Sequence, residues 1–124
     1  MNNQIFLYVG SVFTVVWGVA HLFPTKSVVN SFGEITIDNK RIITMEWIIE
    51  GVFLIFIGLL CSGITYLNIP SIIADYVFIL SSIFLFLLAV ISLFTGFKVN
   101  FLPYKLCPII FSSSAILIII GTYI

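Results

Sequence analysis

Four long apolar stretches dominate this chain, and each is long enough to cross a bilayer as a helix. We place them at about residues 3–22, 41–66, 72–97 and 106–124, since about 20 apolar residues span the hydrocarbon core. Of the 124 residues, 61% are hydrophobic and 8% are charged. In a soluble domain about a quarter of the residues are charged. The sequence therefore predicts an all-α membrane protein, a single four-helix transmembrane domain over residues 1–124.

The basic residues are confined to the first and third connections between these stretches or to their edges. They are Lys26, Lys40, Arg41, Lys98 and Lys105. In a four-span protein these two connections lie on one side of the membrane. The positive-inside rule then predicts loops 23–41 and 98–105 in the cytoplasm and both termini outside, an N-out/C-out topology.

Composition also limits where the protein acts and what it meets. The many Ile, Phe and Asn residues are typical of an AT-rich bacterial genome, so we expect a multi-pass protein of the bacterial cytoplasmic membrane. A net charge of zero argues against nucleic acid as a partner. Membrane lipid is the expected partner, and association into a homo-oligomer is left open.

One face of the first predicted span carries small and polar residues. Gly10, Thr14, Trp17 and His21 follow one another at spacings of four, three and four, which places them on one side of a helix. Gly10, Thr14 and Gly18 also form two small-xxx-small steps, a pattern that lets another helix approach closely. We expect this face, with His21, to point into the bundle.

The connections contain clear helix-ending signals. Pro24 ends the first span, since the residue before a proline avoids the helical region. Residues 27–32 are predicted to form one or two helical turns on the membrane surface, stopped by Gly33. Asp38-Asn39 resembles the N-cap of the second span. The short segment 68–71 predicts a tight hairpin between the second and third spans.

The two cysteines are predicted to lie near opposite ends of the bundle. Cys61 is near the outer end of the second span, and Cys107 is at the start of the fourth, next to Pro108 in its first turn. Helical rise separates them by roughly 20 Å, and a disulfide needs Cα atoms within about 7 Å. We therefore expect two small apolar fillers rather than an intramolecular disulfide.

Two acidic residues within the second span are the clearest candidates for chemistry. Glu46 and Glu50 are four residues apart and share one helical face. Measured from Arg41, they lie roughly 8 Å and 14 Å along the helix, which brings Glu50 toward the midplane. An acid at the bilayer centre costs about 2.5–3.5 kcal/mol on insertion scales. We expect Glu50 to be protonated or partnered; a structural interhelical hydrogen bond is the alternative to a functional role.

His21, the only histidine, is predicted to lie at a depth near that of Glu46, so we expect the two to be partners. An imidazole there could relay protons, ligate a metal or cap its helix. A zinc site of His21, Glu46 and Glu50 is an alternative that lacks a thiolate and a second imidazole. A haem held by two histidines is excluded by the single histidine. We predict no metal and no cofactor.

Aromatic residues flank this cluster. Trp47 neighbours Glu46, Trp17 is one turn before His21, and Tyr104 precedes Lys105 in the third connection. Interfacial anchoring is the usual role of such tryptophans. The alternative is a flat wall for a lipid-like ligand, in which Trp17, Trp47 and Tyr104 would be ligand-binding residues.

Three resemblances to known families add expectations. Residues 46–53, EWIIEGVF, resemble the H-x-x-x-E-G-x-F stretch of the EXPERA family of sterol isomerase-like membrane proteins, with Glu46 in place of the histidine and with Glu50 and Gly51 matching. Arg41 and Glu46 are similar to the Arg and Glu at the start of the second span in the glutathione-dependent MAPEG family, which implies a ligand-binding role for Arg41, although the Asn of that motif is absent. The whole chain resembles short four-helix bacterial membrane proteins, DoxX-like ones included.

These observations favour an intramembrane site that opens to the cytoplasm. It would bind a small lipophilic or amphipathic molecule and would use Glu50, Glu46 and His21 for any acid–base chemistry, with Trp17, Trp47, Arg41 and Tyr104 as ligand-binding residues. A small proton-coupled transporter and a non-catalytic accessory or scaffold protein are the alternatives. No motif names a reaction, so whether the protein is an enzyme stays open.

Overall fold

The computed structural model describes residues 3–124, which fold into helices joined by short connections and contain no β-strand. The elements in chain order are α1 (Asn3–Leu22), α2 (Thr25–Ser31), α3 (Ile37–Tyr66), α4 (Ser71–Phe94), the 3-10 turn η1 (Gly96–Lys98) and α5 (Leu102–Tyr123). Four of them, α1, α3, α4 and α5, are long and apolar enough to cross a membrane. The all-α prediction with four membrane-length helices is therefore confirmed.

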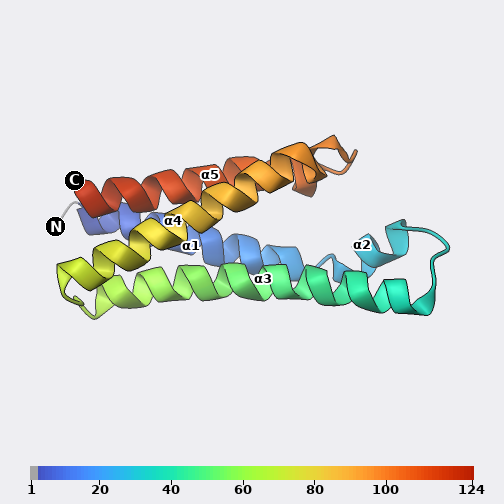
Figure 1. Ribbon diagram of the computed structural model, residues 1–124, viewed down its shortest axis with the longest axis horizontal. Coiled ribbons are helices and arrows are strands. Elements are labelled where there is room, and N and C mark those ends of the chain that lie inside the picture. Colours follow the sequence, from blue (N-terminus) through green and yellow to red (C-terminus); the bar gives the residue numbers. More distant parts are fainter. Residues whose placement is uncertain (1–2) are drawn as a thin grey trace.

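The four long helices pack in the order α3, α1, α5, α4. α1 lies between α3 and α5, and α4 packs against α5. Figure 1 shows α3 and α4 meeting at their turn and then diverging along their length. The connecting turn is as short as predicted, with Asn68 at φ +48°, but the expected tight pairing of the two helices is wrong. Their partners are α1 and α5 instead, because small residues let those helices approach more closely.

Glycines set the contact between α1 and α3. A Cβ atom placed on Gly18 would lie 2.8 Å from the carbonyl oxygen of Gly51. No side chain fits between two backbones at that distance. Gly10, Thr14, Gly18 and His21 are all buried, so the predicted inward face of the first span is confirmed.

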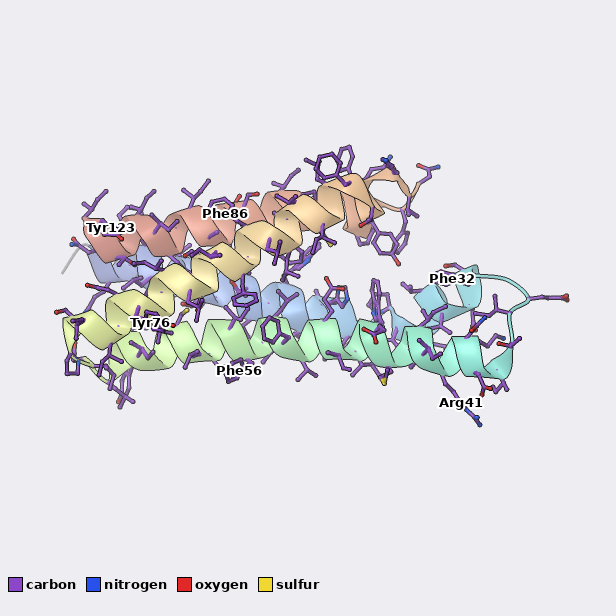
Figure 2. The ribbon with its side chains drawn as sticks, in the orientation of Figure 1. Phe32, Arg41, Phe56, Tyr76, Phe86 and Tyr123 are labelled. Atoms are coloured by element: carbon purple, nitrogen blue, oxygen red, sulfur yellow. The ribbon has the colours of Figure 1, made fainter. Side chains whose placement is uncertain are left out.

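The interior is apolar and so is most of the outer surface. Leu54, Leu85 and Phe111 are almost completely buried and belong to one continuous core. Large apolar side chains also cover the outside of the helices, as Figure 2 shows for Phe56 on α3. A surface of this kind suits hydrocarbon as the surrounding solvent. Cys61 and Cys107 are both free and buried.

Several helix ends differ from the predicted ones. α3 begins at Ile37 because Thr36 is its N-cap, with the Thr36 side chain accepting a hydrogen bond of 3.2 Å from the backbone N–H of Asn39. The predicted cap at residues 38–39 is therefore wrong. α2 begins at Thr25, two residues earlier than expected, and Gly33 follows it at φ +72°, a conformation that favours glycine.

The start of α5 and the end of α4 also differ from the prediction. α5 begins at Leu102, four residues early, because Pro103 is tolerated in the first turn of a helix. Pro108, predicted in that first turn, lies inside the helix, where it removes the N–H that would bond to the carbonyl of Tyr104. α4 ends at Phe94, before Gly96.

Candidate functional site

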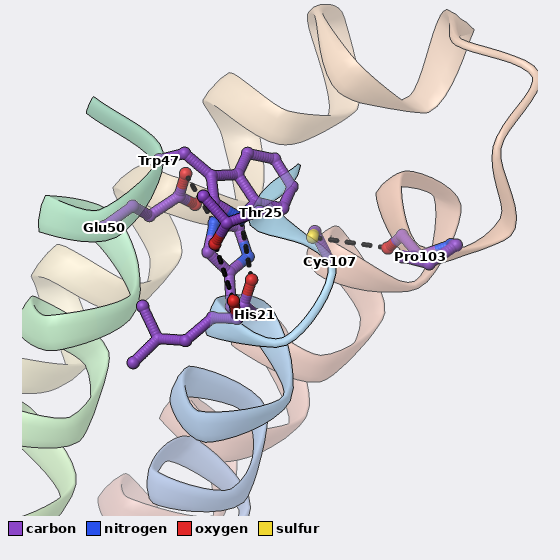
Figure 3. Close-up of polar contacts among 7 residues, drawn as sticks. His21, Thr25, Trp47, Glu50, Pro103 and Cys107 are labelled. Carbon is purple, nitrogen blue, oxygen red and sulfur yellow. Dashed lines mark hydrogen bonds and ion pairs between the residues drawn. The ribbon is translucent and has the colours of Figure 1, made fainter. Parts of the chain in front are cut away.

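A histidine and a glutamate face each other at the end of the bundle where α1 stops. His21 is in the last turn of α1, and its Nε2 atom lies 3.5 Å from Oε2 of Glu50 on α3 (Figure 3). The predicted pairing of His21 with Glu46 is wrong. Gly51 packs against Gly18 and Leu22, so its neighbour Glu50 reaches the height of His21. Glu46 lies one turn farther along α3 and is exposed.

The same contact sets the height of Glu50 in the bundle. The sequence predicted that Glu50 approaches the midplane of the bilayer, a depth counted from Arg41. In the structure Glu50 is level with the last turn of α1, and Figure 1 shows α3 continuing past the end of α1. Glu50 therefore lies beside the end of α1 and near the middle of α3.

Trp47 contacts His21 in two ways, through the imidazole ring and through the backbone carbonyl. The two rings stack with centroids 3.8 Å apart and planes 15° apart. The indole Nε1 of Trp47 also donates a 2.7 Å hydrogen bond to the carbonyl oxygen of His21 (Figure 3). Tyr104 packs edge-on against Trp47, with ring centroids 5.5 Å apart. The imidazole thus stacks on a ring of α3 that Tyr104 of α5 contacts in turn.

The Nε2 atom of His21 is buried and has no hydrogen-bond partner. The His21 side chain is 4% exposed and that of Glu50 is 36% exposed. The 3.5 Å contact between them is at the long limit for a hydrogen bond. Buried polar atoms in proteins nearly always have a hydrogen-bond partner. A bound ligand is one group that could partner Nε2 of His21.

Two cavities meet at Glu50. The inner one, about 180 Å³, lies between α1, α3, α4 and α5 and is lined by His21, Glu50, Leu88, Ile91, Ser92, Thr95, Gly96, Tyr104 and Cys107. The outer one is a wider groove of about 420 Å³ between α3 and α4, lined by Ile42, Ile43, Glu46, Trp47, Ile49, Glu50, Phe53 and Leu88. Glu50 and Leu88 line both. The divergence of α3 from α4 therefore gives the His21–Glu50 pair an opening toward the outside of the bundle.

The aromatic residues expected near the site are gathered there. Trp17, Trp47 and Tyr104 line a smaller cavity of about 110 Å³ together with His21 and Cys107. The indole Nε1 of Trp17, like Nε2 of His21, is buried without a hydrogen-bond partner. The structure thus brings three of the four predicted ligand-binding residues to the histidine.

Arg41, the fourth of them, lies elsewhere. Its side chain is 73% exposed and contacts Asp38 at 3.5 Å, one turn away on α3. It lines neither of the cavities at Glu50. The ligand-binding role for Arg41 that the MAPEG resemblance implied therefore gains no support from its position.

Sequence reasoning missed part of the site on α4 and α5. Ser92 and Thr95 line the inner cavity, as does Cys107, which we had assigned as a filler. Cys107 follows Tyr104 by three residues and so shares its helical face. The spacing would have indicated Cys107 as a site residue if the predicted fourth span had begun at Leu102 and not at residue 106.

The arrangement supplies a carboxyl group, an imidazole and aromatic walls. Within residues 3–124 no group of three His, Cys, Asp or Glu side chains is placed to hold a metal ion, so the geometry gives no support to zinc at His21, Glu46 and Glu50. A carboxyl and an imidazole together can bind a polar group by hydrogen bonds or exchange a proton with it.

The stretch that resembles the EXPERA family lies on α3, where Glu50 faces the cavities and Gly51 faces α1. No family model matches the chain, and no curated protein or solved structure matches it. The resemblances to EXPERA, MAPEG and DoxX-like proteins remain hypotheses.

Proposed function

We propose that this is an integral membrane protein that binds a small lipophilic or amphipathic molecule beside His21 and Glu50. One observation carries the proposal. A buried imidazole without a hydrogen-bond partner faces a partly exposed carboxyl group where an inner cavity joins an apolar groove. Pockets of about 300–1,000 Å³ with apolar walls and a few convergent polar groups are typical of small-molecule sites, and the groove alone is about 420 Å³.

Acid–base chemistry on the bound molecule is the extension of this proposal. Glu50, the more exposed of the pair, would exchange a proton with the ligand. His21 would orient the Glu50 carboxyl group or return a proton to it. A purely scaffolding bundle offers no reason to bury an imidazole without a partner, because an unsatisfied polar group costs about 1–3 kcal/mol. That cost favours a binding function over a scaffolding function.

Packing of the interior disfavours a proton-coupled transporter. A transporter needs access to its site from both ends of the bundle. One turn deeper than Glu50, Leu88 and Cys107 along their helices come Leu54, Leu85 and Phe111, all at most 1% exposed. These side chains belong to the continuous core on that side of the site. Asp75, the acid near the opposite end, lines a separate cavity.

We further propose the orientation that the basic residues favour. The end of α1, the end of α4 and the start of α5 lie at one end of the bundle, and α3 extends past them toward Ile37 (Figure 1). All five basic residues are on this side, namely Lys26, Lys40, Arg41, Lys98 and Lys105. By the positive-inside rule this end faces the cytoplasm, in a bacterial cytoplasmic membrane, with both termini outside.

Native mass spectrometry of protein purified in a mild detergent tests the binding proposal. We expect wild-type protein to retain a small molecule that is lost in Leu88→Trp, which places a larger side chain where the inner cavity and the groove meet. Asp75→Asn, a change at the far end of the bundle, should retain it. Equal retention by Leu88→Trp and wild type, with Leu88→Trp correctly folded, would exclude ligand binding in the two cavities.

A further inference from the structure

The lining of the candidate site has an unbalanced charge. Its two cavities include the carboxyl groups of Glu46 and Glu50, and no Lys or Arg lines either of them. The five basic side chains lie at this end of the bundle but outside the lining: Arg41 contacts Asp38, Lys26 and Lys98 are exposed, and Lys40 and Lys105 line neither cavity. Any group that enters these cavities therefore meets two carboxyl groups, with no Lys or Arg among the lining residues.

The neighbouring imidazole does not satisfy the Glu50 carboxyl group. Nε2 of His21 points at Glu50 from 3.5 Å but makes no hydrogen bond. The His21 side chain is more than nine-tenths buried, whereas about a third of the Glu50 side chain is exposed to the cavities. A ligand can therefore approach the carboxyl group from the cavity side while the imidazole lies behind it.

Aromatic rings complete this environment, and His21 covers one face of Trp47. Trp47 lines the outer groove next to Glu50, and Tyr104 lines the inner cavity. The faces of tryptophan and tyrosine rings attract cations, more strongly where water is excluded. Carboxylates and aromatic rings together form the chemistry that recognises an ammonium group.

The shape of the groove adds an apolar part to the ligand. From the level of Glu50 the groove continues to Phe53 on α3 with Leu88 opposite on α4, which is the direction of the apolar core. Glu50 itself is level with the end of α1. A molecule seated there would have its polar end near the aqueous boundary and its apolar end between two helices.

We infer that the ligand of this site is an amphipathic amine. This inference rests on the proposed binding function and narrows it to one chemical class. The ammonium group lies against Glu50, within reach of Glu46 and the ring of Trp47, and the hydrocarbon part lies between α3 and α4 beside Phe53 and Leu88. An anionic ligand would meet two carboxyl groups there, and a neutral one would hydrogen-bond to them without the added strength of a charged donor.

A series of three octyl compounds tests the ligand class on the intact protein in a neutral maltoside detergent. Octylammonium, octanol and octanoate share a tail and differ in charge. We expect octylammonium to raise the Tm saturably and to change the fluorescence of the two tryptophans at the site, with no saturable effect from the other two. Because a charge-assisted hydrogen bond is lost, Glu50→Gln should weaken octylammonium binding about tenfold or more. The control Asp75→Asn should leave it unchanged.

Each other outcome contradicts the inference in a distinguishable way. Saturable, Glu50-dependent binding of octanol or octanoate would overturn the amine class and leave the binding function intact. Octylammonium effects equal in wild type and Glu50→Gln would show partition into the micelle only. A second membrane polypeptide that co-purifies with the wild type, blocks the titration and is lost in Glu50→Gln would assign the groove to a basic partner helix instead. No saturable effect from any of the three compounds would also overturn the inference, and the mass-spectrometry experiment then decides the binding function separately.

Discussion

Trp47 does more for the site than its predicted role as an aromatic wall. Its indole N–H bonds to the carbonyl of His21, which lies in the last turn of α1. Carbonyls in the last turn of a helix have no partner within the helix. The indole thus caps α1 at the residue whose side chain it also stacks against.

Removing that N–H should destabilise the protein. Trp47→Phe keeps an aromatic ring against His21 but leaves a buried carbonyl without its donor, so we expect a loss of about 1–2 kcal/mol in the free energy of unfolding. Denaturant titration in mixed micelles measures it. Trp17→Phe is the matched control, because the Trp17 N–H donates to no backbone carbonyl. Equal losses in the two variants would contradict the capping role.

Energetic coupling should follow the observed pair rather than the predicted one. His21 contacts Glu50 at 3.5 Å, and Glu46 is exposed one turn away. A double-mutant cycle of His21→Ala with Glu50→Gln should show a coupling energy of about 0.5–1.5 kcal/mol. The cycle of His21→Ala with Glu46→Gln should be additive within error. Coupling in the second cycle alone would restore the pairing predicted from the sequence.

Residue type and spacing were enough to select most of the site. His21, Glu50 and Trp47 stood out because polar or amphipathic groups in membrane-length helices need a reason to be there. The identity of the pair could not be read from spacing. It depends on how α1 is shifted along α3, which the contact of Gly18 with Gly51 determines, and spacing within one helix carries no information about a shift between two.

At the scale of the helices, the effect of a glycine-to-alanine substitution on stability should differ between glycines at close helix contacts and glycines at open positions. A Cβ on Gly18 would lie 2.8 Å from a backbone oxygen of α3, whereas one on Gly63 meets nothing within 4 Å. Gly18→Ala should therefore destabilise by about 1–3 kcal/mol through overpacking. Gly63→Ala should be neutral or stabilising by up to about 1 kcal/mol, because alanine favours a helix. Thermal unfolding of both variants in detergent checks the difference.

Helix existence was predictable from apolar length, and helix ends were less so. Thr36 caps α3 from a position that precedes the expected cap, and Pro103 lies within α5 rather than before it. Both errors arise because capping residues and prolines near a helix start are compatible with several starting positions that differ by a few residues. They mattered for the site, because the early start of α5 is what brings Tyr104 and Cys107 onto one helical face.

For the molecule as a whole, the orientation in the membrane is the main prediction. Asn100, in the loop between η1 and α5, should be cytoplasmic, and Asn68, in the α3–α4 turn, should be outside. In intact cells an impermeant thiol reagent should label a cysteine at residue 68 and spare one at residue 100. The native cysteines are buried and should give little background. Labelling at residue 100 but not at residue 68 would reverse the orientation.

Because α3 and α4 diverge, the width of the groove depends strongly on the angle between the two helices. The two helices are joined at their turn and separate toward Glu50, roughly 24 Å away along α3, so a change of about 5° in their angle moves the opposite walls by about 2 Å. Because α3 and α4 barely touch, that angle is set through the α1–α5 contact, where Gly10 and Gly121 lie against backbone of the partner helix. Substitutions at these two glycines, far from His21, should therefore change which ligands the site admits.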